Sequence, residues 1–82
     1  MVSPIMNNFK RLDEFVLRNP NRLGGEAVFR GTRVPVKTLF TYIRKGHGLE
    51  RFLEDFEGVT RQQALGVLDL AESDILERTR PT

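Results

Sequence analysis

The stretch from Gly24 to Val36 constrains the fold of this chain more than any other part of the sequence. It places three glycines, two arginines and a proline within thirteen residues. Paired glycines interrupt regular structure, Val28-Phe29 predicts a short strand, and Gly31-Thr32 supplies a turn. Pro35 suits the first position of a helix, where its missing N–H costs no hydrogen bond. The stretch therefore predicts a strand, a turn and the entry to a helix.

The segment before this stretch has two interpretations. Phe15–Leu17 is a compact apolar triplet, and the turn-forming residues Arg18–Asn21 follow it. This order predicts a strand that pairs with Ala27–Arg30 in a hairpin with a longer loop. The alternative is a helix that continues from Phe9 through Val16. We prefer the strand.

Three helices are predicted after the stretch, because apolar residues recur there at helical spacing. The first begins at Pro35 and stops at Gly46, and the second is closed by Gly58. The third begins at Thr60, which fits a capping box with Gln63. The three apolar stripes are Val36, Leu39, Phe40 and Ile43; Leu49, Phe52, Leu53 and Phe56; and Ala64, Leu65, Leu68, Ala71, Ile75 and Leu76.

The expected fold class is α+β, mainly α. A short N-terminal β-hairpin is followed by a three-helix unit containing a helix-turn-helix, as in winged-helix and homeodomain-like folds. Eighty-two residues allow one small domain. We expect it over residues 9–76, between a mobile tail at 1–8 and a C-terminal tail at 77–82. A domain of this size has a thin core, so a homodimer is expected.

Charge is distributed unevenly along the chain. Residues 1–49 hold nine Lys/Arg and three Asp/Glu, whereas residues 50–82 hold four and eight. This asymmetry is compatible with an anionic partner such as nucleic acid, and equally with uneven surface charge of no functional meaning. Cysteine is absent, and no apolar run reaches the length of a membrane span or signal peptide. We expect a cytoplasmic protein with no membrane partner.

The second and third helices, joined through Glu57–Val59, match the spacing of a helix-turn-helix, although such pairs also occur as structural corners. The third would be the recognition helix, because Arg61 can bind guanine and Gln62 adenine through paired hydrogen bonds. Arg33 is expected to be structural, and Arg30 to contact phosphate. The predicted DNA-binding residues are Arg30, Lys37, Thr38, Thr60, Arg61 and Gln62.

Nothing in the sequence indicates catalysis. His47 stands alone between two glycines, which is typical of an exposed turn residue rather than of a metal ligand. The acidic pairs Asp13-Glu14 and Glu54-Asp55 are adjacent in sequence, so their side chains point to different helix faces. We expect no catalytic residue, no metal and no cofactor.

Taken together, these motifs resemble the domain-of-unknown-function family four-three-three. The resemblance runs from Phe15 to Ala71 and rests on Gly24-Gly25, on the string Val28–Val36 and on the helix ended by Gly46. Gly48 departs from the Ser or Thr that is frequent in the family, and Glu57 departs from its proline. Many members resemble antitoxins of bacterial type II toxin–antitoxin pairs. The resemblance implies a small helix-turn-helix protein and a PIN-like ribonuclease toxin as partner.

The favoured function is a DNA-binding antitoxin that neutralises its cognate toxin and represses its own operon. The alternative is an interaction or assembly module that keeps the helix-turn-helix shape without binding DNA, because acidic residues of the third helix would repel phosphates. Leu70 lies off the third stripe, so this apolar surface is expected to need another chain. The predicted toxin or dimer interface is Leu68, Leu70, Ile75 and Leu76, with Asp69, Glu72, Asp74 and Glu77 facing a basic toxin surface.

Overall fold

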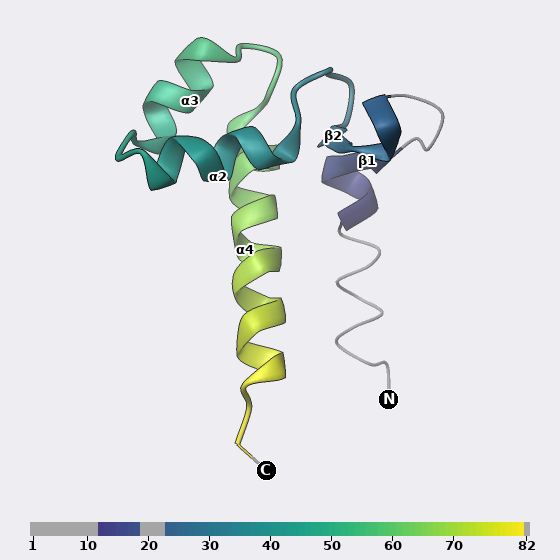
Figure 1. Ribbon diagram of the computed structural model, residues 1–82, viewed down its shortest axis with the longest axis vertical. Helices are drawn as coiled ribbons and strands as arrows, with labels where there is room; N and C mark the ends of the chain where they lie inside the picture. The colour runs from purple at the N-terminus through teal and green to yellow at the C-terminus, as the bar shows by residue number, and fades with distance from the viewer. Residues whose placement is uncertain (1–11, 19–22, 82) are drawn as a thin grey trace.

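The computed structural model describes residues 12–18 and 23–81, and it has the predicted α+β, mainly α class. A small head of short elements lies at one end, and a long helix projects from it (Figure 1). The mobile tail predicted at residues 1–8 lies outside the described residues, as does Phe9. The elements are β1 (Val16–Arg18), η1 (Leu23–Gly25), β2 (Ala27–Phe29), α2 (Val36–Arg44), α3 (Leu49–Asp55) and α4 (Arg61–Arg78).

The hairpin confirms the predicted strand pairing and shifts its start by one residue. β1 is antiparallel to β2, with Val16 opposite Phe29 and Arg18 opposite Ala27. Residues 12–15 are helical, so both interpretations of this segment hold in part, and the assignment of Phe15 to the strand is wrong. The reason is packing: Phe15 is buried in the core, whereas Leu17 on the strand is exposed.

The turn after β2 is fixed by its own hydrogen bonds. The Thr32 hydroxyl donates to the carbonyl oxygen of Phe29 (2.7 Å) and accepts from the backbone N–H of Val34 (3.0 Å). Gly31 has a φ of 80°, a conformation that favours glycine. Pro35 is the N-cap of α2 rather than its first helical residue, because its backbone is still extended (ψ 139°). The stretch therefore forms the predicted joint between hairpin and helix.

The core is centred on three side chains that are fully buried, Phe29, Leu39 and Phe52. The rings of Phe29 and Phe52 pack with their centroids 5.9 Å apart, which joins β2 to α3. α3 ends at Asp55 with Phe56 as its C-cap, so the prediction that Gly58 closes this helix is wrong by two residues. Phe56 has a non-helical backbone (φ −125°, ψ 74°), and its ring packs against that of Phe52 at a centroid distance of 5.2 Å.

α4 begins as predicted. The backbone N–H of Gln63 donates to the Thr60 hydroxyl oxygen (3.1 Å), and the backbone N–H of Thr60 donates to Gln63 Oε1 (2.9 Å). The helix runs to Arg78, past the domain boundary expected at residue 76. None of the helices within residues 12–18 and 23–81 is both long enough and apolar enough to cross a membrane.

The buried face of α4 differs from the predicted stripe. Its buried residues are Ala64, Gly66, Val67 and Leu70. A Cβ built on Gly66 would lie 2.3 Å from Cε2 of Phe15, so the absence of a side chain is what lets the Phe15 ring lie against α4. Leu70 is 8% exposed and belongs to the core, which corrects the expectation that it needs another chain. Leu65, expected in the stripe, is 42% exposed.

Candidate functional site

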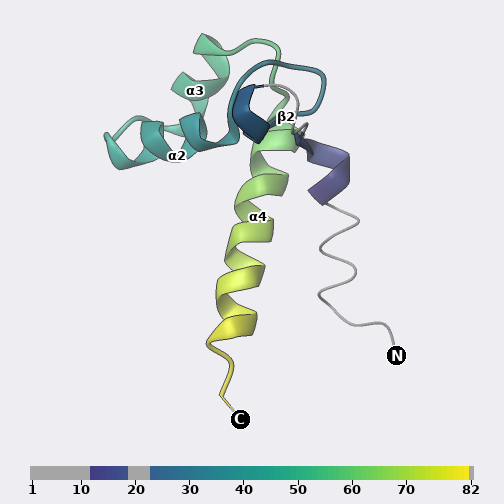
Figure 2. The same ribbon diagram turned by 45° about the vertical axis from the view of Figure 1, so that its right-hand side comes forward.

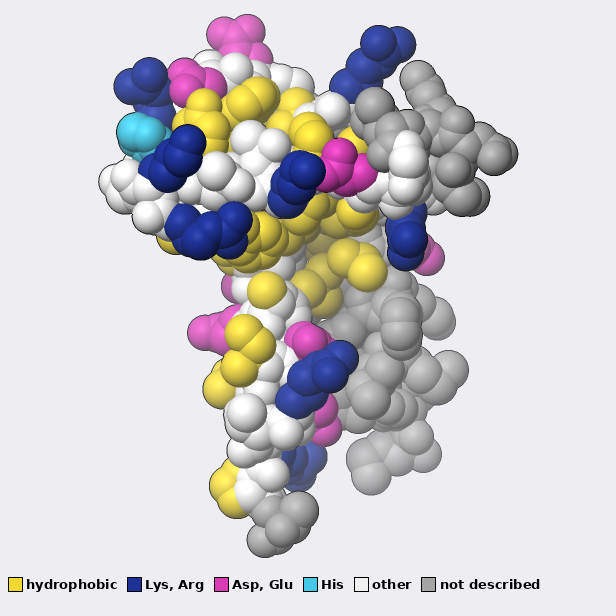
Figure 3. Space-filling model, in the orientation of Figure 1, with side chains coloured by type: hydrophobic (Ala, Val, Ile, Leu, Met, Phe, Trp, Pro, Cys, Tyr) yellow, Lys and Arg dark blue, Asp and Glu magenta, His cyan; other side chains and the backbone are white. Residues whose placement is uncertain are grey.

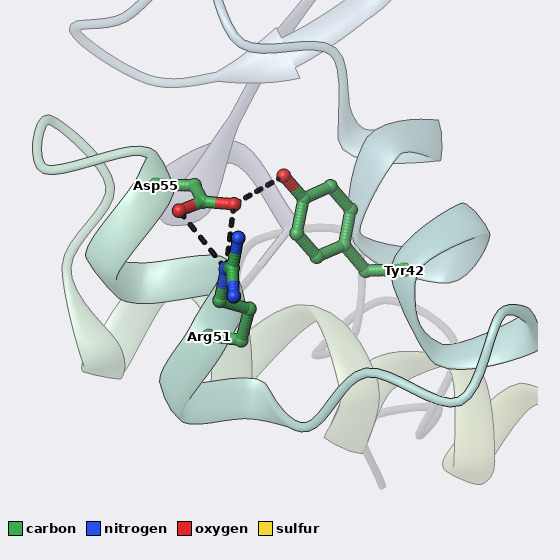
Figure 4. Close-up of polar contacts among 3 residues, drawn as sticks. All are labelled: Tyr42, Arg51 and Asp55. Atoms are coloured by element: carbon green, nitrogen blue, oxygen red, sulfur yellow. Dashed lines mark hydrogen bonds and ion pairs between the residues drawn. The ribbon is translucent and has the colours of Figure 1, made fainter.

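A polar cluster ties α2 to α3 at the outer corner of the head (Figure 4). The Tyr42 hydroxyl donates to Asp55 Oδ2 at 2.7 Å, and Arg51 Nε donates to both carboxylate oxygens of Asp55 at 3.1 and 3.2 Å. The hydrogen bond from Tyr42, followed by that from Arg51, lowers the pKa of the Asp55 carboxyl. The same bond to Asp55 raises the pKa of the Tyr42 hydroxyl. The cluster acts as a clamp between two helices.

His47 lies beside this clamp, on the link between the two helices. It is exposed, in the turn where the sequence predicts it. Its ring packs against Tyr42 with the centroids 5.4 Å apart, and its backbone N–H donates to the Tyr42 carbonyl oxygen (2.9 Å). These contacts give His47 a structural role in closing the corner.

Arg61, the best candidate for reading a base, is held by another helix. Its guanidinium spans the Glu50 carboxylate: Nη2 donates to Oε1 at 2.6 Å and Nη1 donates to Oε2. This hydrogen bonding lowers the pKa of the Glu50 carboxyl. A planar guanidinium engaged through both nitrogens has to release the carboxylate before it can pair with guanine O6 and N7. The start of α4 is therefore anchored to α3 through Arg61.

A second anchor connects the start of α4 to the hairpin. Gln63 Nε2 donates to the carbonyl oxygen of Arg30 at 2.8 Å, and Arg30 Nε donates to the carbonyl oxygen of Asp13 at 2.7 Å. The structural contact expected of Arg33 is thus made by Arg30. Arg33 is exposed, and it forms no ion pair with the acidic side chains that the structure describes.

Intramolecular contacts therefore occupy most of the six predicted DNA-binding residues. Lys37 forms an ion pair with Glu26 (Nζ–Oε1, 2.8 Å), and Thr60 caps α4. Thr38 is half-buried, and Gln62 is exposed on the first turn of α4. The fold does not gather these residues into one surface with free donors.

Three cations, one of them Lys37, lie along α2 and at its C-cap, and we call them the basic edge: Lys37, Arg44 and Lys45. Figure 3 shows dark-blue side chains grouped over this helix. Lys37 and Arg44 are seven residues apart, so they share one helix face. All three are exposed, and Arg44 and Lys45 pair with none of the described acidic side chains. Of this set, only Lys37 is predicted from the sequence as a DNA contact, because cations near a helix C-terminus, such as Arg44 and Lys45, have an ordinary structural role.

The exposed surface of α4 divides into two faces by helical spacing. The first, which we call the acidic-apolar face, consists of Leu65, Asp69, Glu72 and Leu76 at i, i+4, i+7 and i+11. Leu76 is 62% exposed. Further along the helix, Asp74 pairs with Arg78 (3.0 Å) and Glu77 with Arg80 (3.6 Å). Asp69 and Glu72, by contrast, form no ion pair within the described part of the chain.

The second face, which we call the seam, consists of Leu68, Ala71 and Ile75 at i, i+3 and i+7. Leu68 packs partly on the core, and Ile75 is 59% exposed. In Figure 3 hydrophobic side chains follow one edge of α4 upward and continue beneath α2. The seam is thus a continuation of the core surface onto the exposed part of the helix. Of the predicted interface residues, Leu68 and Ile75 lie on the seam, Leu76 lies on the acidic-apolar face, and Leu70 lies on neither.

The sequence reasoning missed Gly66, Val67 and Leu70 as the inward face. A signal was present, since Ala64, Val67 and Leu70 follow one another at intervals of three residues. It was hidden because Leu65, Leu68 and Leu76 form a second apolar pattern on the same helix. When a helix is apolar on two sides, periodicity alone does not show which side faces the core of its own chain.

Comparison with known proteins identifies relatives of unknown function. The matching family is described as a protein of unknown function, DUF433, and the match covers residues 16–71. The uncharacterized protein y4eO of Sinorhizobium fredii is 36% identical over 67 residues, which are 82% of this chain and 30% of that protein. This chain therefore spans less than a third of the length of that relative. The crystal structure of a DUF433 member protein from Anabaena variabilis has a TM-score of 0.65 and 26% identity, over 90% of this chain and 75% of the other.

Proposed function

The chain belongs to the DUF433 family, whose function is unknown, and we propose that it is a type II antitoxin that binds and neutralises a ribonuclease-like toxin. The proposal has two supports. The first is the resemblance of many family members to antitoxins. The second, which carries it, is the acidic-apolar face of α4. Leu65 and Leu76 are exposed there beside two carboxylates that have no partner among the described basic residues.

This face has the composition that suits a basic protein surface. Apolar side chains exposed next to unpaired acids are typical of an interface core with a polar rim. A ribonuclease has to present cations to its anionic substrate, so its active site is a natural counterpart for Asp69 and Glu72. If this face covered the active site of the ribonuclease, it would exclude RNA both sterically and by charge repulsion.

The test is rescue of growth in a bacterial host. The product of the neighbouring reading frame is expressed alone, with the full chain, or with the L65S/L76S variant. We expect toxicity alone, rescue by the wild-type chain and loss of rescue with the variant. Leu17→Ser is the matched control, because Leu17 is 41% exposed and Leu65 is 42% exposed, yet Leu17 lies on β1. A chain cut after Ala71 should also fail to rescue.

Two outcomes would contradict this function. One is a neighbouring product that does not inhibit growth. The other is full rescue by L65S/L76S, provided that its circular dichroism spectrum matches that of the wild-type chain. Leu65 is 42% exposed and Leu76 is 62% exposed, so the substitutions should leave the fold intact.

Operon repression through DNA binding is the second candidate function, and one observation favours it. Between Ala27 and Leu49 the chain has five basic residues and no acidic one, and the basic edge lies within this segment. Such a surface suits phosphate contacts, which position a protein on DNA without reading its sequence. The engaged state of Arg61 argues against base reading from the start of α4.

The measurement is the affinity for a duplex from the region upstream of its own reading frame, followed as salt is raised. With roughly four to six phosphate contacts, binding should weaken about 10²- to 10³-fold between about 50 and 200 mM salt. R44E/K45E should abolish binding, whereas R78E/R80E at the far end of α4 should not. Binding that does not respond to salt would exclude this candidate and leave a protein-interaction module.

A further inference from the structure

The ion pair between Glu50 of α3 and Arg61 of α4 is open to solvent. The side chain of Glu50 is 67% exposed, and that of Arg61 is 54% exposed. Exposed ion pairs are weak, and opening one changes an equilibrium constant by no more than about fivefold. Arg61 can therefore exchange the Glu50 carboxylate for another acceptor at a small cost.

The start of α4 does not depend on this pair to stay in place. The capping box of Thr60 and Gln63 fixes its first turn, and Gln63 Nε2 also donates to the carbonyl oxygen of Arg30 at 2.8 Å. Figure 2 shows the short link that leaves α3 and arches over to the start of α4. Opening the pair therefore redirects the Arg61 side chain and leaves the helix where it is.

Glu50 occupies the donors of Arg61 that a guanine would use. Its carboxylate accepts hydrogen bonds from Nη1 and from Nη2, the second at 2.6 Å. Guanine presents O6 and N7 as two acceptors on one edge in the major groove, so a guanidinium can meet it in the same two-pronged way. The carboxylate and the base edge therefore compete for the same two donors.

We propose that Glu50 is an autoinhibitory residue that keeps Arg61 from contacting DNA until a guanine displaces the carboxylate. The basic edge supplies phosphate contacts, which carry no sequence information, and the released Arg61 adds recognition of one base. The engaged state of Arg61, which argues against base reading in the free chain, is then the closed state of a switch. This role of Glu50 rests on the proposed DNA-binding function and adds its regulation.

The experiment compares two substitutions on α3 by fluorescence anisotropy with labelled duplexes. One duplex comes from the region upstream of the reading frame, and the other has the same bases in scrambled order. E50Q should bind the upstream duplex about three- to fivefold more tightly than E54Q, because the closed pair lowers the apparent affinity by the fraction of molecules in which Arg61 is released.

Glu54 is the matched control for Glu50. It lies on α3 one turn later, is exposed, and forms no ion pair with the basic side chains that the structure describes. Both substitutions remove one negative charge from the same helix, so only the release of Arg61 distinguishes them. Both should keep the urea midpoint of the wild-type chain, because the two side chains are exposed.

Two further comparisons identify Arg61 and its target. E50Q/R61A should bind the upstream duplex no more tightly than E54Q/R61A, and E50Q and E54Q should bind the scrambled duplex equally. The proposal is overturned if E50Q and E54Q bind the upstream duplex alike. It is also overturned if the gain survives removal of Arg61, or if the gain is as large on the scrambled duplex.

Failure of this switch is distinguishable from failure of the DNA-binding function. Salt-dependent binding by the wild-type chain, abolished in R44E/K45E, supports that function whatever E50Q does. If E50Q and E54Q are then equal, only the role of Glu50 fails. If no variant binds either duplex at about 50 mM salt, both fail.

Discussion

The head and the projecting part of α4 differ in how far their apolar side chains are buried and their polar side chains are hydrogen-bonded. In the head, apolar groups are buried around Phe29, Leu39 and Phe52, and polar groups are engaged by one another, as in Tyr42 with Asp55. Beyond Leu70, α4 exposes Ile75 and Leu76 to solvent. The head has the character of a finished scaffold, whereas the helix has the character of a surface for another molecule. The proposed toxin contact therefore lies on α4, whereas the proposed DNA contact lies on the basic edge of the head.

The largest expected difference between the two regions is in stability. Phe52→Ala removes a fully buried ring that contacts Phe29, Tyr42 and Phe56. It should lower the free energy of unfolding by about 3–5 kcal/mol, a large fraction of the total for a domain of this size. Leu76→Ala also removes an apolar side chain, but Leu76 is 62% exposed, so it should change the free energy of unfolding by less than about 0.5 kcal/mol. Urea denaturation of both variants makes the measurement.

A loss of similar size in the two variants would contradict the distinction between scaffold and surface. If Phe52→Ala does not fold at all, Phe52→Leu provides the measurable intermediate, since it keeps most of the buried volume.

The next effect is at the boundary between the two regions, where α4 meets Phe15. Gly66→Ala would normally stabilise a helix by about 1 kcal/mol. Here the new methyl group would lie 2.3 Å from the Phe15 ring, so we expect a net loss of about 1–3 kcal/mol in the free energy of unfolding. Thermal or urea unfolding measures it. Adding Phe15→Leu should recover part of the loss, and a Gly66→Ala variant more stable than the wild type would show that Phe15 does not rest on Gly66.

The smallest effect concerns the pH dependence of the clamp. The folded-state pKa of Asp55 is lowered, so its contribution to stability is present above the unfolded pKa of about 3.9 and is lost as pH falls through the folded value. Tyr42 has a raised pKa, so its contribution is present below about 10 and is lost as pH rises through the folded value. Tyr42→Phe should therefore flatten both limbs of the stability profile.

Urea denaturation across a pH series, with the free energy of unfolding as the readout, tests the clamp. Asp55→Asn should flatten the acid limb of the stability profile. The double variant Tyr42→Phe/Asp55→Asn should lose less free energy of unfolding than the sum of the two single losses, because both substitutions act on the same hydrogen bond. An acid limb unchanged in Asp55→Asn would show that this carboxylate is not held by the clamp in solution.

Local features of the sequence determined much of this protein. Pro35, Gly46 and the capping box of Thr60 and Gln63 act through their own backbone geometry and hydrogen bonds within a few residues. They therefore predicted where helices begin and end, and the family match over residues 16–71 includes the string around Gly31. The pairing of β1 with β2 was also predictable, because the two apolar runs are close neighbours in the sequence with turn-forming residues between them.

Tertiary structure decided which faces point inward and which charges are engaged. Leu70 is buried and Leu65 exposed although both lie on one apolar helix, because the inward side depends on where Phe15 lies, about fifty residues earlier. Arg61 pairs with Glu50 and Lys37 with Glu26, and neither partner follows from spacing. Such contacts join segments that are distant in sequence, and a local pattern holds no information about the distance between them. The sequence alone therefore predicted the helices and most of their ends, whereas only the packed fold showed which side of α4 is buried and which of its described side chains stay exposed on the seam and the acidic-apolar face.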